Sequence, residues 1–400
     1  MKAALAEKSG WGRAAHVFWL LGPFILLIER SPADLWLSLL ALVFLGRSVA
    51  RKDFSWLKVF WVRAVLVFWA VTLVSALASA DPSYALGEAL IWIRFPLFAM
   101  ATVFWLAQDK RLLYAMLIST GLGMVAMCGI LTAELIIVGQ QHGRLSWPYG
   151  DLVPGNYLAK VGLPAFSIMV ALAVSVRGRL AALLGTVGLA TMVLSIMTGE
   201  RVNFIIRACG GMLAGLVWRP KLGRYIILVL IEVAAVVLLF KSKPDVAERF
   251  IGTFIEHLPT GSHSPYYNTM KPGFLAFDSA PVLGIGTGNF RNMCADLVAG
   301  QPLLECHPHP HNFYIQLLGE NGIIGLIAGT VMMWSIIATC FIAGRRNKAN
   351  VVAATAFVVP LGLFWPIAST ADFFGQWNNI FMWSALALAL AATTLKSDRN

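Results

Sequence analysis

The sequence predicts an all-α, polytopic integral membrane protein with about twelve transmembrane helices and one long loop that carries short helices. Hydrophobic residues make up 58% of the 400 residues, charged residues make up only 13%, and the mean hydropathy is +0.73. A soluble domain needs a more strongly charged surface, whereas apolar runs of about 20 residues suit the hydrocarbon core of a bilayer. Basic residues also gather in the short connections between these runs.

Twelve apolar runs, each close to the length that a bilayer requires, follow one another along the chain. They lie at 14–29, 33–46, 59–80, 88–107, 112–138, 158–176, 180–198, 204–218, 225–240, 323–343, 351–370 and 378–395. The ninth and tenth runs are separated by the connection 241–321, which is rich in polar and turn residues. We therefore expect residues 1–400 to form a single transmembrane domain that contains 241–321 as a large loop.

The lysines and arginines predict the orientation. If the N-terminus is cytoplasmic, the basic residues of alternate connections fall on its side, as the positive-inside rule expects. They are Lys2, Lys8, Arg13; Arg47, Arg51, Lys52, Lys58; Lys110, Arg111; Arg177, Arg179; Arg219, Lys221, Arg224; Arg345, Arg346, Lys348; Lys396 and Arg399. The large loop then faces outward. Because the net charge of +11 follows from this topology, we do not expect nucleic-acid binding.

A histidine motif closes the large loop. Three of the seven histidines are His307, His309 and His311, and the intervening prolines keep the backbone extended. Asn312 is a good N-cap for a helix through Glu320. This places His311 at a helix N-terminus, where a protonated imidazole is disfavoured and a neutral one can act as a base. The alternative is that His311 satisfies backbone carbonyls in a buried turn.

Two neighbouring histidines and two outward segments add candidates. His307 and His309 could bind a metal, although support for His311 is the preferred interpretation. The loop 139–157 carries Arg144, Trp147 and Tyr149, which suit stacking on sugar rings or, equally, an aromatic belt at the membrane interface. The segment 372–379 contributes further aromatic and amide side chains.

Two spacings resemble a known family. The first is His311-Asn312 followed by Gly322-Ile-Ile-Gly325, and the second is Pro281-x-x-Gly284-x-Gly286-x-x-x-Phe290. Both resemble the bacterial lipopolysaccharide O-antigen ligases, within a superfamily that also holds O-antigen polymerases and protein O-oligosaccharyltransferases. The resemblance is clear over about residues 195–345 and extends elsewhere only in topology.

The resemblance implies an activity, partners and a location. It implies a membrane glycosyltransferase that moves O-antigen glycan from undecaprenyl diphosphate to a sugar hydroxyl of lipid A–core, in lipopolysaccharide biosynthesis. The chain would sit in the bacterial inner membrane with its active site and large loop facing the periplasm. Donor, acceptor and membrane lipids are the expected partners.

Site residues follow from the resemblance position by position. Asn156 resembles an asparagine of the superfamily, and Arg201 stands where members usually carry a Ser-Arg pair, with Glu200 in place of the serine. The alternative for Arg201 is an anchor to lipid headgroups. An arginine expected about fifteen residues before Pro281 is absent, and Tyr266 occupies that position. Unless this ungapped count is wrong, its phosphate-binding role passes to a nearby cation. The candidates are Lys271, Arg249 and Arg291.

Glycan transfer needs a base near the acceptor hydroxyl and cations on the diphosphate. We assign the first task to His311 and the second to Arg201 with a loop cation, since an arginine binds phosphate oxygens bidentately. His309 and Asn312 are expected to assist in substrate binding. No Asp-x-Asp occurs in the sequence, so we expect transfer without a metal or other cofactor. A single displacement would invert the anomeric configuration.

Alternatives from another class remain. A transporter or flippase of lipid-linked glycan would also need intramembrane charges, and Arg63, Arg94, Lys160 and Arg207 fall within apolar runs. We find no internal repeat of the kind that transporters often show. Among the five cysteines, Cys294 and Cys306 lie in the outward loop, where a disulfide and two free thiols are equally compatible with the sequence.

Overall fold

The computed structural model describes residues 4–5, 10–141, 143–150, 153–218, 222–258 and 264–395. Within these residues the chain is helical, and its only β pairing is one isolated bridge between Gln141 and Arg144. This confirms the all-α prediction. Six of the basic residues used for orientation, Lys2, Lys8, Arg219, Lys221, Lys396 and Arg399, lie outside the described residues.

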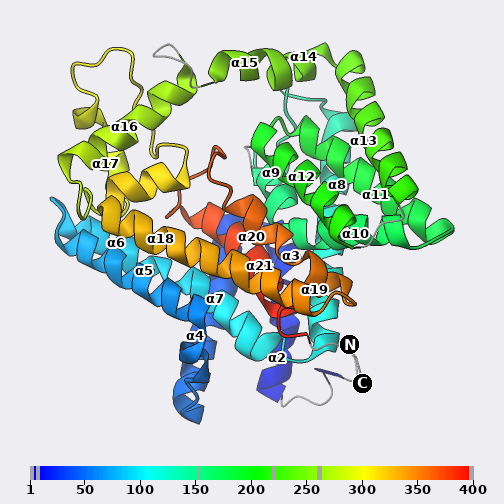
Figure 1. Cartoon of the computed structure of the whole chain (residues 1–400), viewed down its shortest axis with the longest axis horizontal. Coiled ribbons are helices and arrows are strands. Elements are labelled where there is room, and N and C mark those ends of the chain that lie inside the picture. Colours follow the sequence, from blue (N-terminus) through cyan, green and yellow to red (C-terminus); the bar gives the residue numbers. More distant parts are fainter. Residues whose placement is uncertain are drawn as a thin grey trace.

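The helices fall into two groups along the chain (Figure 1). The first group is α2 (Gly10–Leu20), α3 (Gly22–Ile25), α4 (Arg30–Arg51), η1 (Ser55–Lys58), α5 (Phe60–Leu77), α6 (Pro82–Trp92), α7 (Arg94–Ala101), η2 (Thr102–Leu106), α8 (Lys110–Ile137), α9 (Val153–Asn156), η3 (Tyr157–Val161), α10 (Leu163–Ser175), α11 (Arg179–Met197), α12 (Arg201–Val217) and α13 (Leu222–Ser242). The second is α14 (Pro244–Ala247), η4 (Glu248–Gly252), α15 (Thr253–His257), α16 (Pro265–Ser279), α17 (Phe290–Leu297), α18 (Phe313–Arg346), α19 (Val351–Thr355), α20 (Val358–Leu363) and α21 (Gln376–Ala392).

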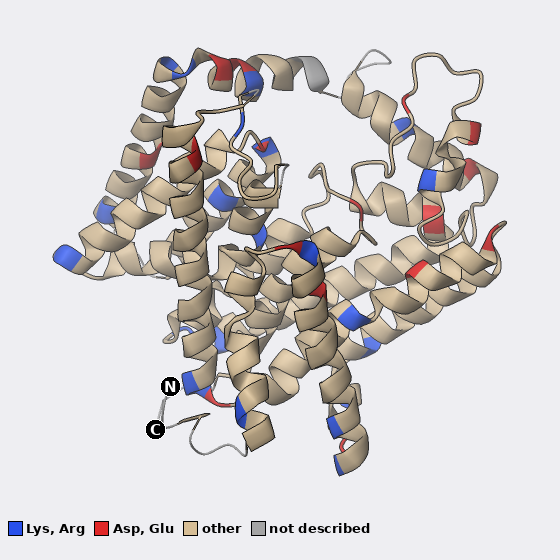
Figure 2. Cartoon of the chain, turned by 180° about the vertical axis from the view of Figure 1, so that it is seen from behind, with Lys and Arg blue, Asp and Glu red and all other residues tan. Residues whose placement is uncertain are grey.

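Seven helical segments among the described residues are long and apolar enough to cross a bilayer, and an eighth is obtained if a pair bent by 57° is one span. The bent pair joins 153–161 to 163–175. The other four predicted runs are also helical, but each helix there has 17 residues or fewer. The chain is therefore a polytopic membrane protein, while the count of twelve spans stays a prediction. Figure 2 shows that charged residues are sparse along the long helices.

The centre of the bundle is α21. Every residue from Ile380 to Ala392 is buried, and the ring of Trp383 meets that of Trp92 edge-on with centroids 5.9 Å apart. In Figure 1 this red helix lies among the others, whereas α13 lies at one edge and buries none of its residues. An apolar helix inside a bundle packs on all sides, and a lipid-facing one is apolar because its solvent is the bilayer.

The large connection, predicted at 241–321, is organised around α18. The chain leaves α13 at Ser242 and enters the first part of α18 at Phe313, before the kink at Gly322. The helices α14 and α15 run from α13 toward α16, which packs on α18 (Figure 1). A Cβ on Gly319 would lie 2.8 Å from the carbonyl oxygen of Gly273, so this close approach requires a glycine.

The two motifs that resemble the ligase family are paired through backbone hydrogen bonds. The amide of Ile285 donates to Gly319 at 3.1 Å, and the amide of Gly286 donates to Glu320 at 2.9 Å. Gly322 interrupts the helical backbone of α18 with φ of 65°, and a Cβ there would lie 2.3 Å from the carbonyl oxygen of Val282. Only glycine meets both requirements. The break separates the short helix after the histidines from the long apolar helix, as the sequence predicts.

A disulfide between Cys294 of α17 and Cys306 restrains the approach to the histidines, with the two Cα atoms 5.4 Å apart. We expect mass mapping of non-reduced, alkylated protein to find these two cysteines in one cross-linked peptide, while the exposed Cys209 carries the label. The chain-entropy gain of such a short loop is about 3 kcal/mol. Alkylation of both Cys294 and Cys306 without prior reduction would contradict the bridge.

Candidate functional site

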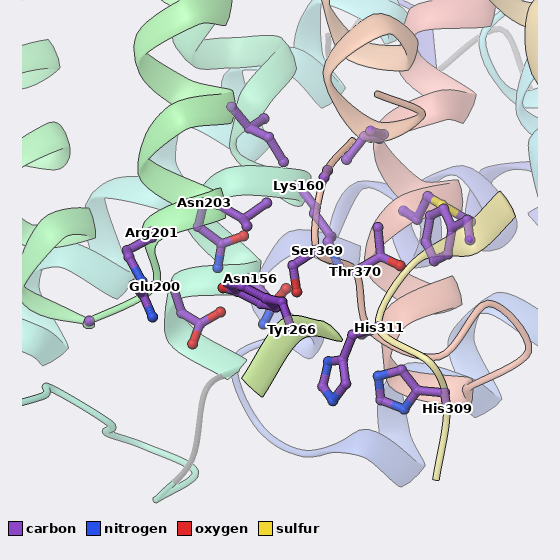
Figure 3. Close-up of a pocket in the computed structure, with 18 of the residues that line it drawn as sticks. Asn156, Lys160, Glu200, Arg201, Asn203, Tyr266, His309, His311, Ser369 and Thr370 are labelled. Carbon is purple, nitrogen blue, oxygen red and sulfur yellow. The ribbon is translucent and has the colours of Figure 1, made fainter. Parts of the chain in front are cut away.

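A cavity of about 330 Å³ lies where several parts of the chain meet. Its walls come from the bend between α9 and α10, the first turns of α12, the loop before α12, the η4–α16 region, and the two segments 309–313 and 368–371. In the view of Figure 3, Glu200, Arg201 and Asn203 lie on one side of it and His309 and His311 on the other. Most of its polar side chains are therefore far apart in the sequence.

The histidine side of the cavity is held in an unusual backbone conformation. His311 has a φ of 53°, in the left-handed region, and its carbonyl oxygen accepts a hydrogen bond from the amide of Thr370 at 2.8 Å. The ring centroids of His309 and His311 are 4.3 Å apart, and those of His307 and His311 are 5.5 Å apart. A left-handed non-glycine residue costs free energy, and such residues cluster at functional sites.

The local chemistry keeps the imidazole of His311 neutral. Burial lowers its pKa to about 4, and positive charge on His309 and His307 lowers it further. The direction agrees with the sequence prediction, and burial is the largest cause. Burial also lowers the pKa of His309, against the opposing effect of the Asp372 carboxylate. Nε2 of His309 is buried and has no hydrogen-bond partner among the described residues.

Asn312 fixes the histidines to the rest of the fold. As predicted, its side-chain oxygen caps α18, accepting from the amides of Tyr314 at 3.0 Å and Ile315 at 3.2 Å. Its Nδ2 donates to the carbonyls of Pro366 at 2.8 Å and Ala368 at 3.1 Å. The side chain therefore joins the start of α18 to the segment that forms the neighbouring wall.

The opposite wall is cationic. Four cations line the cavity, and Glu200 is the one carboxylate among the described lining residues. Arg249 donates from Nε to the carbonyl of Gly199 at 3.0 Å, and Arg144 forms a 3.3 Å ion pair with Glu200. Arg201 is the first residue of α12, and its guanidinium lies 5.8 Å from the ring centroid of Phe254. The fourth cation, Lys160, comes from η3.

Glu200 responds to both burial and these cations. Burial raises the pKa of its carboxyl, while Arg144, Lys160 and Arg201 oppose the shift. A carboxylate that is held by Arg144 reduces the excess positive charge without removing it. The cavity can accordingly take a ligand with more than one negative charge beside a group that offers a proton to a neutral imidazole.

Six of the nine site residues predicted from the sequence line this cavity: Asn156, Arg201, Arg249, Tyr266, His309 and His311. The other three do not. Lys271 lies elsewhere on α16, Asn312 is used as described above, and Arg291 forms an ion pair with Asp372. Among the loop cations, the structure thus favours Arg249 as the partner of Arg201.

Sequence reasoning left several lining residues out of the site. Lys160 carried a signal, since it is a charge within an apolar run, and Arg144 carried a weaker one as a cation in an outward loop. Ser369 and Thr370 were assigned to a membrane run, 351–370, because the surrounding residues are apolar. In the structure α20 ends at Leu363 and the chain then turns back along the cavity.

Comparisons with known proteins found a matching family and a similar solved structure. Residues 158–329 match the family described as O-antigen ligase. No curated protein matches the chain. A solved chain from a study titled "Structural coordination of polymerization and crosslinking by a peptidoglycan synthase complex" aligns with a TM-score of 0.49 and 14% identity, over 83% of this chain and 96% of that one.

The Asn312 bonds generate a prediction about the exposure of the histidines. Asn312→Ala removes a cap, which costs about 0.5–2 kcal/mol, and frees the wall segment at Ala368. We expect diethyl pyrocarbonate to modify His309 and His311 several-fold faster in this variant, as followed by peptide mass. Asn350→Ala is the matched control, because Asn350 caps α19 in the same manner but does not line the cavity. Equal modification rates in both variants would refute the positioning role.

Proposed function

Because this chain belongs to the O-antigen ligase superfamily, we propose that it transfers O-antigen glycan from undecaprenyl diphosphate to a sugar hydroxyl of lipid A–core. The reaction takes place at the periplasmic face of the bacterial inner membrane and serves lipopolysaccharide biosynthesis. One observation supports this most strongly: a single cavity joins a buried, neutral His311 to a wall with Arg201 and Arg249. Glycosyl transfer from a lipid diphosphate needs a general base and cations together.

The proposed step is a single displacement. An imidazole nitrogen of His311 takes the proton of the acceptor hydroxyl as its oxygen forms a bond to the anomeric carbon of the donor. The bond from that carbon to the diphosphate oxygen breaks, and undecaprenyl diphosphate leaves with the electron pair. Attack from the face opposite the leaving group inverts the anomeric configuration. His309, 4.3 Å away between ring centroids, supports the orientation of the base.

The cationic wall stabilises the leaving group. Negative charge grows on the diphosphate as the glycosidic bond breaks, and fixed cations in a buried site stabilise that charge without reorganising. Arg249 is held by the carbonyl of Gly199, next to Arg201 at the N-terminus of α12. Helix N-termini favour anions, so the backbone there reinforces the two guanidinium groups. We assign contacts with the glycan to Asn156 and Tyr266, which line the same cavity.

The acceptor distinguishes the proposed ligase from the other enzymes of the superfamily. An O-antigen polymerase or a protein O-oligosaccharyltransferase would use the same base and cations with a glycan or a protein hydroxyl instead. A transporter of the donor would have no use for a base. Purified protein is therefore mixed with undecaprenyl-diphosphate glycan and, in separate reactions, rough lipopolysaccharide, a second donor molecule or an acceptor protein. Product in the lipopolysaccharide reaction alone supports the proposal, and product only in another reaction reassigns it.

The base role predicts the effect of one substitution. His311→Ala should lower kcat by about 100- to 10,000-fold, the usual contribution of general base catalysis. His16→Ala serves as a control, since it removes a buried imidazole that bonds to Gly12 in α2, away from the cavity. Initial rates in the lipopolysaccharide reaction, together with thermal unfolding in detergent, measure both effects. Near-normal transfer by a folded His311→Ala protein would exclude the base.

The lowered pKa of His311 predicts the acid side of the pH profile. The imidazole is neutral above its pKa of about 4, so kcat/KM should stay level from about pH 8 to about pH 5 and fall below that. Bound diphosphate stabilises the protonated form and raises the pKa, so kcat should begin to fall at a higher pH than kcat/KM. Coincident acid limbs centred near the ordinary histidine value would contradict this environment.

We also propose that transfer is independent of metal. The sequence has no Asp-x-Asp, and no three His, Cys, Asp or Glu side chains of the described residues form a group that could hold an ion. Rates should change by less than about twofold in EDTA, because the cations of the wall take the place that a metal would occupy. Activity lost in EDTA and restored by magnesium or manganese would refute the prediction.

A further inference from the structure

Lys160 is a charge that the proposed mechanism has not yet used. It lies in η3, at the bend of the broken span, and is 8% exposed. A charged side chain at membrane depth is costly, and such residues face a cavity or a partner. Lys160 lines the cavity, and in the view of Figure 3 it lies above His311.

The protein gives Lys160 a neutral partner. Its Nζ donates to Oδ1 of Asn378, whose Nδ2 donates in turn to the carbonyl of Asp372 at 3.0 Å. These bonds fix the ammonium but do not neutralise it. The carboxylate of Glu200 acts on Lys160 from a distance and is already paired with Arg144. Since an ammonium has three donors, Lys160 can still offer hydrogen bonds to a ligand.

The side chain of Asn203 is a second, independent observation that points to a ligand at this site. It is 3% exposed, lies one turn into α12, and lines the same cavity. Its Nδ2 is buried and has no hydrogen-bond partner among the described residues. Gly155 packs closely against this amide, because a Cβ there would lie 3.1 Å from the nitrogen. Buried donors are nearly always satisfied, so an acceptor atom from outside the chain is expected at this point.

We propose that Lys160 and Asn203 form an anion subsite that binds one of the two phosphates of the lipid donor, while Arg201 and Arg249 hold the other. The proposal rests on the proposed function and deepens it. Lys160, from the bent span, and the two guanidinium groups near the start of α12 then hold the diphosphate from different elements of the cationic wall. The consequence is selectivity: the cavity prefers a lipid diphosphate to a lipid monophosphate, which fills only one of the two positions.

A purely structural role for Lys160 makes a different prediction. If the lysine only anchors η3 to α21 through Asn378, its replacement should affect folding, or both lipids equally. Lys160→Gln separates the two roles, because the glutamine amide can still donate to Oδ1 of Asn378 while the charge is lost. Asn203→Ala removes the orphan donor without touching that anchor. Lys243→Gln is the matched control, since Lys243 is exposed and does not line the cavity.

The experiment titrates the full purified chain in detergent with undecaprenyl diphosphate or undecaprenyl monophosphate and measures binding by native mass spectrometry. The wild-type protein and Lys243→Gln should prefer the diphosphate. Lys160→Gln should weaken diphosphate binding by roughly 10- to 100-fold, as expected for a lost charge-assisted hydrogen bond, and monophosphate binding by less than about threefold. Asn203→Ala should change the preference in the same direction by a smaller factor.

Three results overturn the subsite: an unchanged preference in a folded Lys160→Gln protein, an equal loss for both lipids, or an unchanged preference in Asn203→Ala. Thermal unfolding identifies a variant that fails to fold, and Asn203→Ala then decides alone. Because binding is measured without turnover, a failure of the proposed function remains distinguishable. A wild-type protein that prefers the diphosphate but ligates no glycan refutes the function and leaves the subsite to be judged by the two variants.

Discussion

The pairing of 281–286 with 319–323 is the constraint on which the site depends. Amides of Ile285, Gly286 and Ile323 donate to carbonyls across this contact at 2.9–3.1 Å. Gly322 allows the helix to break there, because no side chain fits against the carbonyl of Val282. The break fixes where the short helix after the histidines ends, and the Asn312 cap fixes where it starts. The direction in which the histidine segment enters the cavity follows from that start.

A second set of contacts connects the short helix to Lys160 in the cationic wall. Gln316, on the short helix, donates to Asp372 at 2.7 Å and accepts from the amide of Phe373 at 2.8 Å. Asp372 accepts from Asn378 through its carbonyl, and Asn378 holds Lys160. The start of α18, next to His311, and the buried ammonium are therefore joined by one continuous network. Such networks fix geometry when every member is satisfied.

The charges of the site are costly in a membrane protein, and the fold limits that cost in two ways. Arg144 and Glu200 pair with each other, while Arg249 uses a backbone carbonyl. Lys160 is left with a neutral partner, and the excess positive charge is directed into the cavity. An anionic ligand would complete the compensation, as the proposed diphosphate would.

The sequence by itself determined the all-α membrane class, the cap at Asn312, the break at Gly322 and the candidates His311 and Arg201, because apolar run length, capping and glycine conformation are local properties. Only the tertiary structure decided which polar residues meet. It selected Arg249 over Lys271 and Arg291, and it brought in Lys160 and Asn203 from spans. It also turned the end of the predicted run 351–370 into a cavity wall. These outcomes depend on contacts between residues far apart in the sequence, which no local pattern encodes.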